Sequence, residues 1–395
     1  MQEVIFILLL VLFLLYCLLI IYYRRAWKQV PGFEARTEAR KPQTRISVII
    51  PARNEEKNIG ACLDSLEKQS YPKELVEVLV VDDHSTDKTA EIILRYSSTT
   101  IKLVSLKDHT ADEALNSYKK KAIETAIGLS TGELIVTTDA DCIVPQQWLL
   151  TIATFYEQYQ PAFIAAPVSI GHHSRFIEIF QSLDFMTLQG ITGASVYKRI
   201  HSMCNGANLA YTKKAFEEVN GFAGIDSIAS GDDMLLMHKI YKRYPGKVLF
   251  LKSADAIVQT APVKTWGEFF NQRIRWASKA GKYDDKRIFR VLLIVYLFNL
   301  SLLLVPVAVL FSNPVFDLHI YPVSIRMTLL ESWVIMLLFK TFFELRFLLP
   351  VAAFFGKQGL LWFFPLMQPF HIIYTVIAGW LGQFGSYTWK QRNVK

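Results

Sequence analysis

The chain has 395 residues, 52% of them hydrophobic, with a mean hydropathy of +0.25 and a formal net charge of +8. This length allows one large domain or two smaller ones, and the hydropathy is high for a soluble protein. Much of the positive charge flanks apolar segments, as in residues 279–290, where it suits anionic lipid headgroups better than nucleic acid. Membrane lipids are therefore expected partners, and nucleic acid is not.

The four cysteines are widely spaced and form no disulfide or metal-ligand pattern, which fits a reduced cytosolic domain. They are Cys17, Cys62, Cys142 and Cys204. This spacing excludes a disulfide scaffold and a zinc-binding module as the basis of the fold.

An uncharged apolar run covers residues 4–23 and is long enough to cross a membrane. No small-residue cleavage site follows it, so we expect a retained anchor over residues 1–25. Glu3 precedes the run, and basic residues follow it at Arg24, Arg25 and Lys28. The positive-inside rule then places the amino end outside and the next part of the chain in the cytoplasm.

After a polar linker, short apolar runs alternate with helical patterns, which predicts right-handed βαβ units and a mostly parallel sheet. The expected strands are residues 46–51, 76–81, 101–106, 134–138 and 163–168. The expected helices between them start near residues 59 and 88, and a third covers residues 118–129. The chain lacks a Gly-x-Gly-x-x-Gly or Gly-Lys-Ser/Thr loop, which excludes dinucleotide and P-loop folds.

Carboxylates follow three of these strands. Parallel strands end at one edge of a sheet, so Glu55, Asp83 and Asp141 can converge despite their distance in sequence. The pair Asp139 and Asp141 is a hard-oxygen site for Mg²⁺ or Mn²⁺, which usually also holds phosphate oxygens. The alternative is a solvated loop, because Asp favours turns.

Three further features lie beyond residue 174. Residues 204–210 predict a turn into a strand, and residues 230–233 place two acids before a helix, where they could simply complement the helix dipole. Residues 264–280 predict an amphipathic helix that is basic and rich in aromatic side chains. Such a helix could also lie at a membrane surface.

The last hundred residues are again apolar, and we expect about three spans within residues 290–385. Residues 291–311 and 359–382 each suit one crossing, whereas residues 327–356 are long and interrupted by charges. Three spans would put the carboxyl end outside, but Lys390, Arg392 and Lys395 favour inside. A hairpin within residues 327–356 would satisfy the charges.

Together, these features resemble family 2 glycosyltransferases of the GT-A fold, over about residues 45–280. The similarity is greatest to the membrane-embedded group of cellulose, hyaluronan and poly-N-acetylglucosamine synthases and ceramide glucosyltransferases. The motifs that carry it, in chain order, are residues 47–55, Asp82-Asp83, Asp139-Ala140-Asp141, Gly231-Asp232-Asp233 and residues 272–276.

The resemblance implies a donor site at the strand ends. Asp141 corresponds to the family's metal ligand, with Asp139 in the metal or ribose shell, and Asp83 to the carboxylate that holds the nucleotide base. Lys119 corresponds to a lysine near the diphosphate, although Tyr118 replaces the usual glycine and residues 119–121 could be a solvated lysine run. The donor-binding residues it implies are Pro51, Glu55, Asp83, Lys119, Asp139 and Arg275.

On the acceptor side, the resemblance implies that Asp233 is the general base, which would take a proton from the acceptor hydroxyl. Asp232, Gln272 and Trp276 would position acceptor and donor, and membrane-interface packing is the alternative for Trp276. Two turns, at residues 204–206 and 220–222, are looser versions of the family's glycine-rich acceptor segments.

We therefore expect an integral inner-membrane protein with a cytoplasmic α/β domain of the GT-A fold over residues 45–285. Its activity would be inverting, metal-dependent transfer from a nucleotide sugar, a UDP-sugar, to a lipid or glycan acceptor, with Mn²⁺ or Mg²⁺ as cofactor. One alternative is a processive β-polysaccharide synthase, although the chain has fewer spans than known polymer synthases. Others are an inactive membrane scaffold and a lipid-binding protein with an incidental α/β domain.

Overall fold

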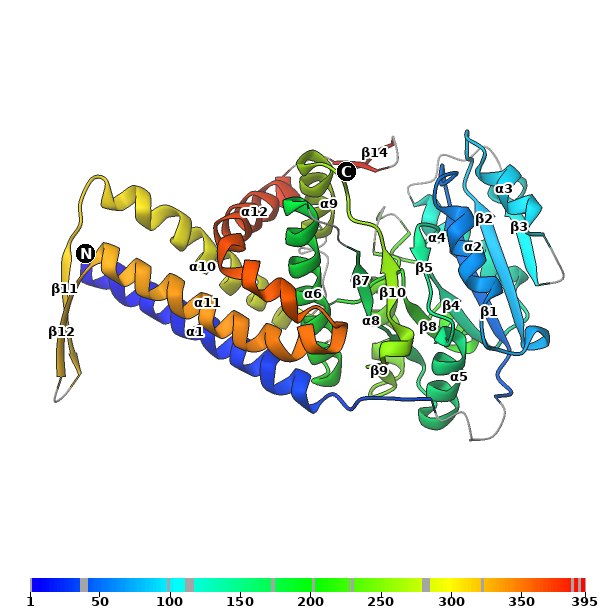
Figure 1. Cartoon of the computed structure of the whole chain (residues 1–395), viewed down its shortest axis with the longest axis horizontal. Helices are drawn as coiled ribbons and strands as arrows, with labels where there is room; N and C mark the ends of the chain where they lie inside the picture. Colours follow the sequence, from blue (N-terminus) through cyan, green and yellow to red (C-terminus); the bar gives the residue numbers. More distant parts are fainter. Residues whose placement is uncertain are drawn as a thin grey trace. The chain divides into compact units, whose positions relative to one another are not determined.

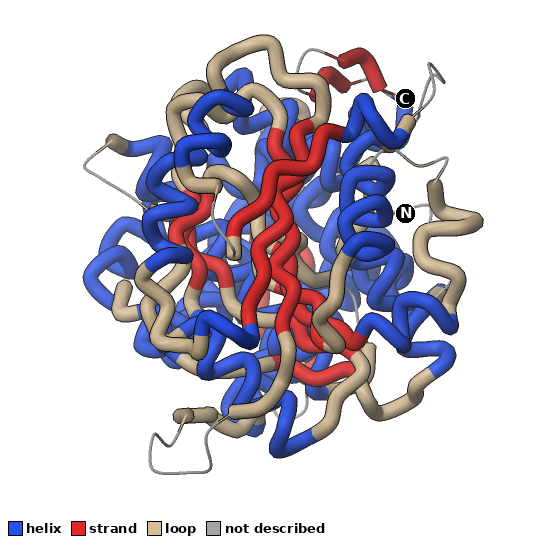
Figure 2. Tube along the Cα trace, turned by 90° about the vertical axis from the view of Figure 1, so that its right-hand side faces the viewer, coloured by secondary structure: helices blue, strands red, loops and turns tan. Residues whose placement is uncertain are grey.

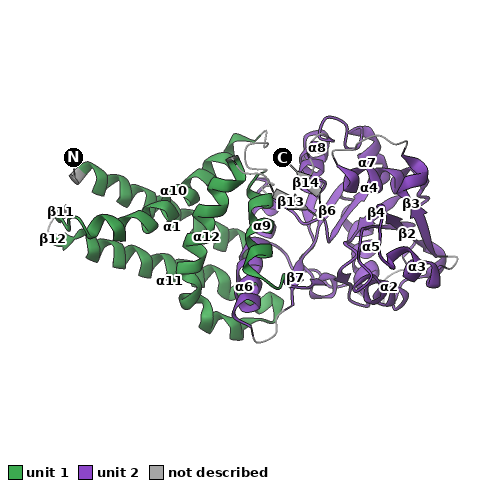
Figure 3. Ribbon diagram, turned by 90° about the horizontal axis from the view of Figure 1, so that it is seen from above, with its two compact units in different colours: residues 1–28, 263–387 green, residues 29–262, 388–395 purple. Residues whose placement is uncertain are grey.

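The computed structural model describes residues 2–35, 42–97, 100–110, 117–171, 175–200, 203–226, 228, 231–278, 285–320, 323–384, 387–389 and 392–394. The basic run 279–284, Ser230, Lys390 and Lys395, which the sequence interpretation used, lie outside this part. The chain forms two compact units (Figure 3). Unit 1 comprises residues 1–28 and 263–387, and unit 2 comprises residues 29–262 and 388–395.

A seven-stranded sheet forms the core of unit 2, in the order β3-β2-β1-β4-β8-β6-β9 (Figures 1 and 2). Its strands are β1 Ile46–Ala52, β2 Val76–Asp82, β3 Ile101–Ser105, β4 Leu134–Thr137, β6 Phe163–Ala165, β8 Leu209–Thr212 and β9 Val248–Phe250. The first four run parallel, β8 runs antiparallel to β4 and β6, and β6 is parallel to β9. The predicted α/β class with a mostly parallel sheet is confirmed.

β1 is central because it is apolar on both faces, with Val48, Ile49 and Ile50 fully buried. Its register brings the ends of three strands to one edge: Ala52 pairs with Asp82 of β2, and Ile49 pairs with Thr137 of β4. The acids that follow these strands therefore start from neighbouring positions, as the sequence predicted.

Helices cover this sheet. They are α2 Ile59–Glu67, α3 Thr89–Arg95, α4 Tyr118–Leu129, α5 Trp148–Tyr159, α6 Phe176–Tyr197, α7 Lys213–Glu218 and α8 Met234–Arg243, with short 3₁₀ turns η1 Lys73–Leu75, η2 Leu106–His109 and η3 Ala254–Ala256. α4 packs on β1 and β2, α3 on β2 and β3, and α8 on β9. Helices expected near residues 59 and 88 and over 118–129 are confirmed.

A second, three-stranded sheet in unit 2 has the order β5-β10-β7, from Cys142–Ile143, Val258–Thr260 and Val168–Ile170. The strand predicted over residues 163–168 was wrong in one respect. It breaks into β6 and β7, which belong to different sheets, because Pro167 lies between them and cannot donate to a ladder.

Unit 1 is mainly helical (Figure 3). It contains α1 Gln2–Gln29, α9 Trp266–Ala277, α10 Lys286–Val309, α11 Leu329–Phe355, η5 Gln358–Phe363 and α12 Phe364–Phe384, with a hairpin of β11 Val315–Ile320 and β12 Val323–Thr328. Two short strands, β13 Tyr387–Trp389 and β14 Arg392–Val394, pair near the carboxyl end. Within the described residues, three stretches are long and apolar enough to cross a membrane: Val4–Gln29, Lys286–Val309 and Gln358–Gln383.

α11 is one continuous helix of 27 residues, so the hairpin considered for residues 327–356 does not form. Two of its charges, Lys340 and Glu344, are buried inside the unit. Lys340 is fully buried and ion-pairs with Glu344, one turn along the same helix, at 2.8 Å. Gln368 of α12 and Tyr16 of α1 both donate to the Glu344 carboxylate. The (i, i+4) spacing therefore allows a single helix to neutralise its own charge.

Candidate active site

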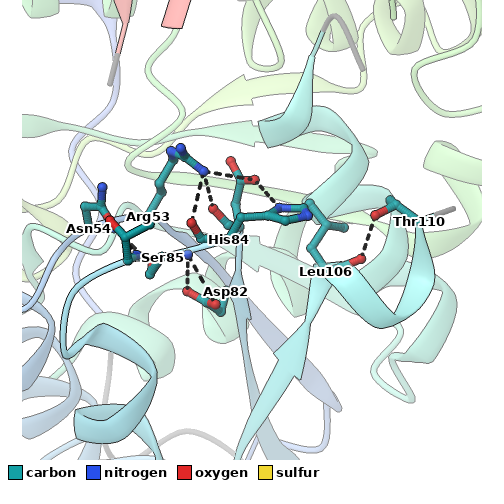
Figure 4. A network of polar contacts seen from close by, with 9 residues as sticks. Arg53, Asn54, Asp82, His84, Ser85, Leu106 and Thr110 are labelled. Atoms are coloured by element: carbon teal, nitrogen blue, oxygen red, sulfur yellow. Dashed lines mark hydrogen bonds and ion pairs between the residues drawn. The ribbon is translucent and has the colours of Figure 1, made fainter. Parts of the chain in front are cut away.

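Asp83 lies immediately beyond β2 and is 3% exposed. Its backbone N–H donates to the Ala52 carbonyl at 2.8 Å, which extends the pairing of β1 and β2 by one residue. Arg53 crosses from the β1 side and donates to the carbonyls of Asp83 at 2.7 Å and His84 at 3.2 Å (Figure 4). The His84 ring nitrogen lies 3.1 Å from the Asp83 carboxylate. The predicted base-binding carboxylate is thus held rigidly at the strand end.

The loop after β1 is joined to the loop after β2. Asn54, at φ +52°, donates its N–H to the Ser85 hydroxyl at 3.0 Å, and its side-chain carbonyl accepts from the Thr86 N–H at 2.8 Å. Glu55 donates its N–H to the Thr89 hydroxyl at 2.7 Å, and its carboxylate accepts from Asn58. The Glu55 side chain therefore makes a hydrogen bond within its own turn, and its predicted contact with the donor stays a prediction. Pro51 lies within β1, opposite Val81 of β2.

The Asp139–Asp141 pair forms the turn between β4 and β5, where the Cys142 N–H donates to the Asp139 carbonyl at 3.1 Å. The thiol of Cys62 lies 3.8 Å from that carbonyl. Burial raises the pKa of Cys62 to about 12, with further contributions from the carboxylates of Asp141, Asp139 and Glu55. Asp141, Asp139 and Glu55 thus lie near one buried thiol. Glu55 and Asp141 are two of the three acids that the sequence expected to converge, and the place of Asp83 beside them stays a prediction.

Lys119 connects this turn to a distant part of the chain. It lies in the first turn of α4, and its ammonium is 2.8 Å from the Asp139 carboxylate and 3.1 Å from that of Asp232. Burial lowers its pKa, but Asp139, Asp232 and Asp233 together raise it above the ordinary lysine value. The interpretation of Lys119 as part of a solvated run is therefore wrong: its side chain is 19% exposed and bound to two acids.

Gly206 explains how these groups come so close. A Cβ at this position would lie 3.2 Å from the Asp232 carboxylate, 3.3 Å from the Lys119 ammonium and 3.7 Å from the Asp233 Cβ. Its carbonyl accepts from the Thr137 hydroxyl at 3.1 Å, at the end of β4. The turn at residues 204–206 thus packs against the acids, and a glycine there leaves them room.

Asp233 is the N-cap of α8, and its carboxylate accepts from the Met234 N–H at 2.7 Å. Asp233 therefore caps the helix, at the helix start where the sequence suggested that the acids could complement the helix dipole. The cap does not exclude a second role, because Asp233 is only partly buried and contributes to the raised pKa of Lys119. Asp232 faces Lys119 directly, a contact that the sequence did not reveal.

Gln272, Arg275 and Trp276 lie on α9, which belongs to unit 1, so they are described within that unit. The sequence interpretation overlooked Arg273. This side chain is buried and donates to the side-chain carbonyl of Gln272 at 2.6 Å. Its guanidinium carbon lies 4.2 Å from the centre of the Trp276 ring. The signal was its place between two of the predicted positions, Gln272 and Trp276, and its side chain contacts both.

Asp139 and Asp141 offer hard carboxylate oxygens at one turn, and the Asp139 side chain is 35% exposed. No three His, Cys, Asp or Glu side chains form a metal cage among the described residues. Two carboxylates with room for phosphate oxygens and water fit Mg²⁺ or Mn²⁺ chemistry, because these ions rarely use an all-protein cage.

Two family models match the chain: "Glycosyl transferase family 2" over residues 47–219, and "Glycosyl transferase family group 2" over residues 134–380, more than half of it. Glycosyltransferase AglE of Haloferax volcanii is 42% identical over 104 residues, 26% of this chain and 33% of AglE. The poly(ribitol-phosphate) β-N-acetylglucosaminyltransferase TarS of Staphylococcus aureus is 33% identical over 116 residues, 29% of this chain and 19% of TarS. The chain thus matches at most a third of either curated relative.

A solved structure, the mannosyltransferase PcManGT from Pyrobaculum calidifontis in complex with GDP-Man and Mn²⁺, aligns over 97% of this chain and 99% of its own. The TM-score is 0.56 and the sequence identity is 20%, a similarity of fold. The parallel sheet, the acids at its edge and the matched family model lead to one conclusion. The chain belongs to glycosyl transferase family group 2 and has a GT-A-like fold.

Proposed function

We propose that the protein is an inverting, metal-dependent transferase that moves a sugar from a UDP-sugar to a lipid or glycan acceptor. The observation that carries the proposal is the ion-pair cluster in which Lys119 lies 2.8 Å from Asp139 and 3.1 Å from Asp232. It joins the end of β4, where donor chemistry is expected, to the start of α8, where acceptor chemistry is expected.

On the donor side, Asp83 would accept a hydrogen bond from the nucleotide base, next to Pro51 and Glu55. Asp139 and Asp141 would hold a divalent cation, which when bound supplies charge neutralisation for the departing diphosphate. Lys119 and Arg275 would bind phosphate oxygens, Lys119 as a point charge and Arg275 through its planar guanidinium. Binding a donor would thus compete with the carboxylates that now hold Lys119.

On the acceptor side, Asp233 would take the proton of the attacking hydroxyl. That oxygen would form a bond to the anomeric carbon from the side opposite the nucleotide diphosphate, whose bond breaks. One such displacement inverts the configuration, so an α-linked donor would give a β-linked product. Asp232, Gln272 and Trp276 would orient the two substrates, and Arg273 would hold the last two in place.

For the whole chain we propose an anchor at residues 1–25, a cytoplasmic transferase domain at residues 45–285 and a membrane region at residues 290–385. Support comes from the three helical stretches that are long and apolar enough to cross a membrane. The basic residues after the first stretch favour a cytoplasmic active site at the inner membrane.

A single transfer is favoured over processive synthesis because the described residues contain three stretches that are long and apolar enough to cross a membrane, fewer than a secretion channel would need. The relative TarS is a poly(ribitol-phosphate) β-N-acetylglucosaminyltransferase, which supports a β-linked product here. Family membership and a full set of acids at the sheet edge argue against an inactive scaffold.

The test is nucleotide release and product formation by the purified full-length protein in phosphatidylethanolamine–phosphatidylglycerol vesicles. Donors would be UDP-glucose, UDP-N-acetylglucosamine and GDP-mannose, each with Mn²⁺ or with excess chelator. Acceptors would be diacylglycerol, a polyprenyl phosphate and a poly(ribitol phosphate) oligomer. We expect Mn²⁺-dependent transfer from a UDP-sugar. Turnover in excess chelator would contradict the metal requirement, and use of GDP-mannose alone would contradict the UDP assignment.

A further inference from the structure

Lys120 is the second of three consecutive lysines at the start of α4, yet it is only 2% exposed. Its ammonium donates to the carbonyls of Ile225 and Ile228, both at 2.5 Å. Burying an ammonium is costly unless polar partners replace water, so these two contacts define where the side chain can be.

The three lysines point in different directions because successive residues on a helix are about 100° apart. Lys119 reaches the carboxylates of Asp139 and Asp232. Lys121 is 40% exposed and pairs with Glu124 on the outside of the helix. Lys120 contacts the loop between α7 and α8 at the Ile225 and Ile228 carbonyls, and Lys119 contacts the end of the same loop at Asp232.

The beginning of this loop is fixed separately. Lys239 of α8 donates to the carbonyls of Gly221 at 2.6 Å and Ala223 at 2.7 Å. Gly221 has φ +47°, and a Cβ there would lie 2.8 Å from the Phe216 ring, so only glycine fits. Lys120 therefore holds the loop further along, at Ile225 and Ile228, ahead of the N-cap Asp233.

We propose that Lys120 is a positioning residue that sets the place of Asp233 toward the acceptor hydroxyl. This inference rests on the proposed function, in which Asp233 is the general base. A buried ammonium holds the two carbonyls five and eight residues before the base, so it restrains the chain close to the start of α8. A shift of about 1 Å in a reacting group can cost roughly 10²-fold in rate.

The test compares Lys120→Met with Lys121→Met, which changes the neighbouring exposed lysine, in the full-length protein in vesicles. Lys120→Met should lower kcat by about 10–100-fold. The Kd for the UDP-sugar should stay within about twofold of the wild-type value, because the donor would bind near Asp139 and Asp141 and not near the loop that Lys120 contacts. The stoichiometry of donor binding gives the folded fraction, and kcat is divided by it. Lys121→Met should keep wild-type kcat and Kd.

A double-mutant cycle distinguishes a positioning role of Lys120 from a general loss of structure. If Lys120 acts through Asp233, Lys120→Met should cause no further loss of kcat in the Asp233→Asn background. The inference is overturned by equal losses in both backgrounds, by an unchanged kcat in Lys120→Met, or by a parallel loss of donor affinity. Should Lys120→Met fail to fold, Lys120→Gln, which keeps an N–H donor, takes its place in the same cycle.

The results for Asp233→Asn show whether the proposed function itself fails. Wild-type turnover in Asp233→Asn alone would remove the general base, and the role of Lys120 with it. An inactive Asp233→Asn beside a fully active Lys120→Met would leave the proposed function intact and remove only the positioning role.

Discussion

Two lysine–carboxylate networks, one in each unit, differ in how completely they are closed. In unit 1, Lys340 is fully buried, and its ammonium lies 2.8 and 3.0 Å from the two Glu344 oxygens and 2.6 Å from the Gln368 carbonyl. In unit 2, Lys119 is 19% exposed and lies between Asp139, 35% exposed, and Asp232, 13% exposed. The first network is sealed, and the second remains open to solvent.

The difference in solvent access determines how easily a charged group in each network can exchange one partner for another. In a sealed site a lost partner leaves a buried charge, so the network of unit 1 is suited to holding α1, α11 and α12 together. At an open site water, a metal ion or a phosphate can replace a partner at small cost. The network of unit 2 is therefore suited to a binding site, where Asp139 must be able to change partners.

Asp141→Ala should give the largest effect, because it would remove the proposed metal ligand two residues after Asp139 of the open network. Charge stabilisation by a metal is worth several kcal/mol, so transfer should fall at least roughly a thousandfold. Mn²⁺-dependent nucleotide binding, measured by titration calorimetry, should be lost, and the melting temperature should stay close to that of the wild type. Normal Mn²⁺-dependent binding in this variant would move the metal site elsewhere.

Asp233→Asn should slow transfer by about 10²–10⁴-fold, the usual contribution of a general base. Donor affinity should hardly change, because this acid would contact the acceptor. Asp232→Asn is the matched comparison: its pairing with Lys119 predicts a smaller loss of turnover, accompanied by a change in donor KM. Equal, mild losses of turnover in both variants would contradict the general-base role. Asp233 would then have only its role as the helix cap that accepts from the Met234 N–H.

Glu344→Ala should leave the Lys340 charge buried without its carboxylate and destabilise unit 1 by roughly 3–5 kcal/mol. The readout is the melting temperature in detergent. Lys340→Met combined with Glu344→Leu should recover most of the loss, because no charge then remains to be buried. Arg346→Ala, at an exposed position of the same helix, serves as the control. Unchanged melting of Glu344→Ala would mean that the sealed network does not hold the helices.

Lys119→Met should be the mildest change, raising donor KM by about tenfold. Its loss of stability should be smaller than that of Glu344→Ala, because solvent reaches this network and can hydrate the carboxylates that lose their partner. Burial lowers the pKa of Lys119 and its carboxylates raise it more, so the ammonium stays charged at neutral pH. Its contribution to stability is present below the ordinary lysine pKa and is lost only as the pH rises through the raised value. A pH–stability difference between variant and wild type that appears near pH 7 would contradict this.

The sequence alone determined the elements and the motifs. Apolar runs on both faces predicted the parallel strands β1, β2 and β4. Their common direction led to the expectation that Glu55, Asp83 and Asp141 meet at one edge. Local signals sufficed here because side-chain periodicity and strand direction depend on the residues themselves. The combination of motifs then indicated the family that the matched models show.

Only the tertiary structure decided which of several similar residues serve the site. Lys119, Lys120 and Lys121 are identical in sequence terms, yet one binds two acids, one holds a loop and one is exposed. Likewise, the charges of α11 could be read as breaking a span until Lys340 paired with Glu344 inside a continuous helix. The physical reason is the same in both cases. The role of a charged side chain depends on partners that lie far away in the sequence, and only the packed fold brings them together.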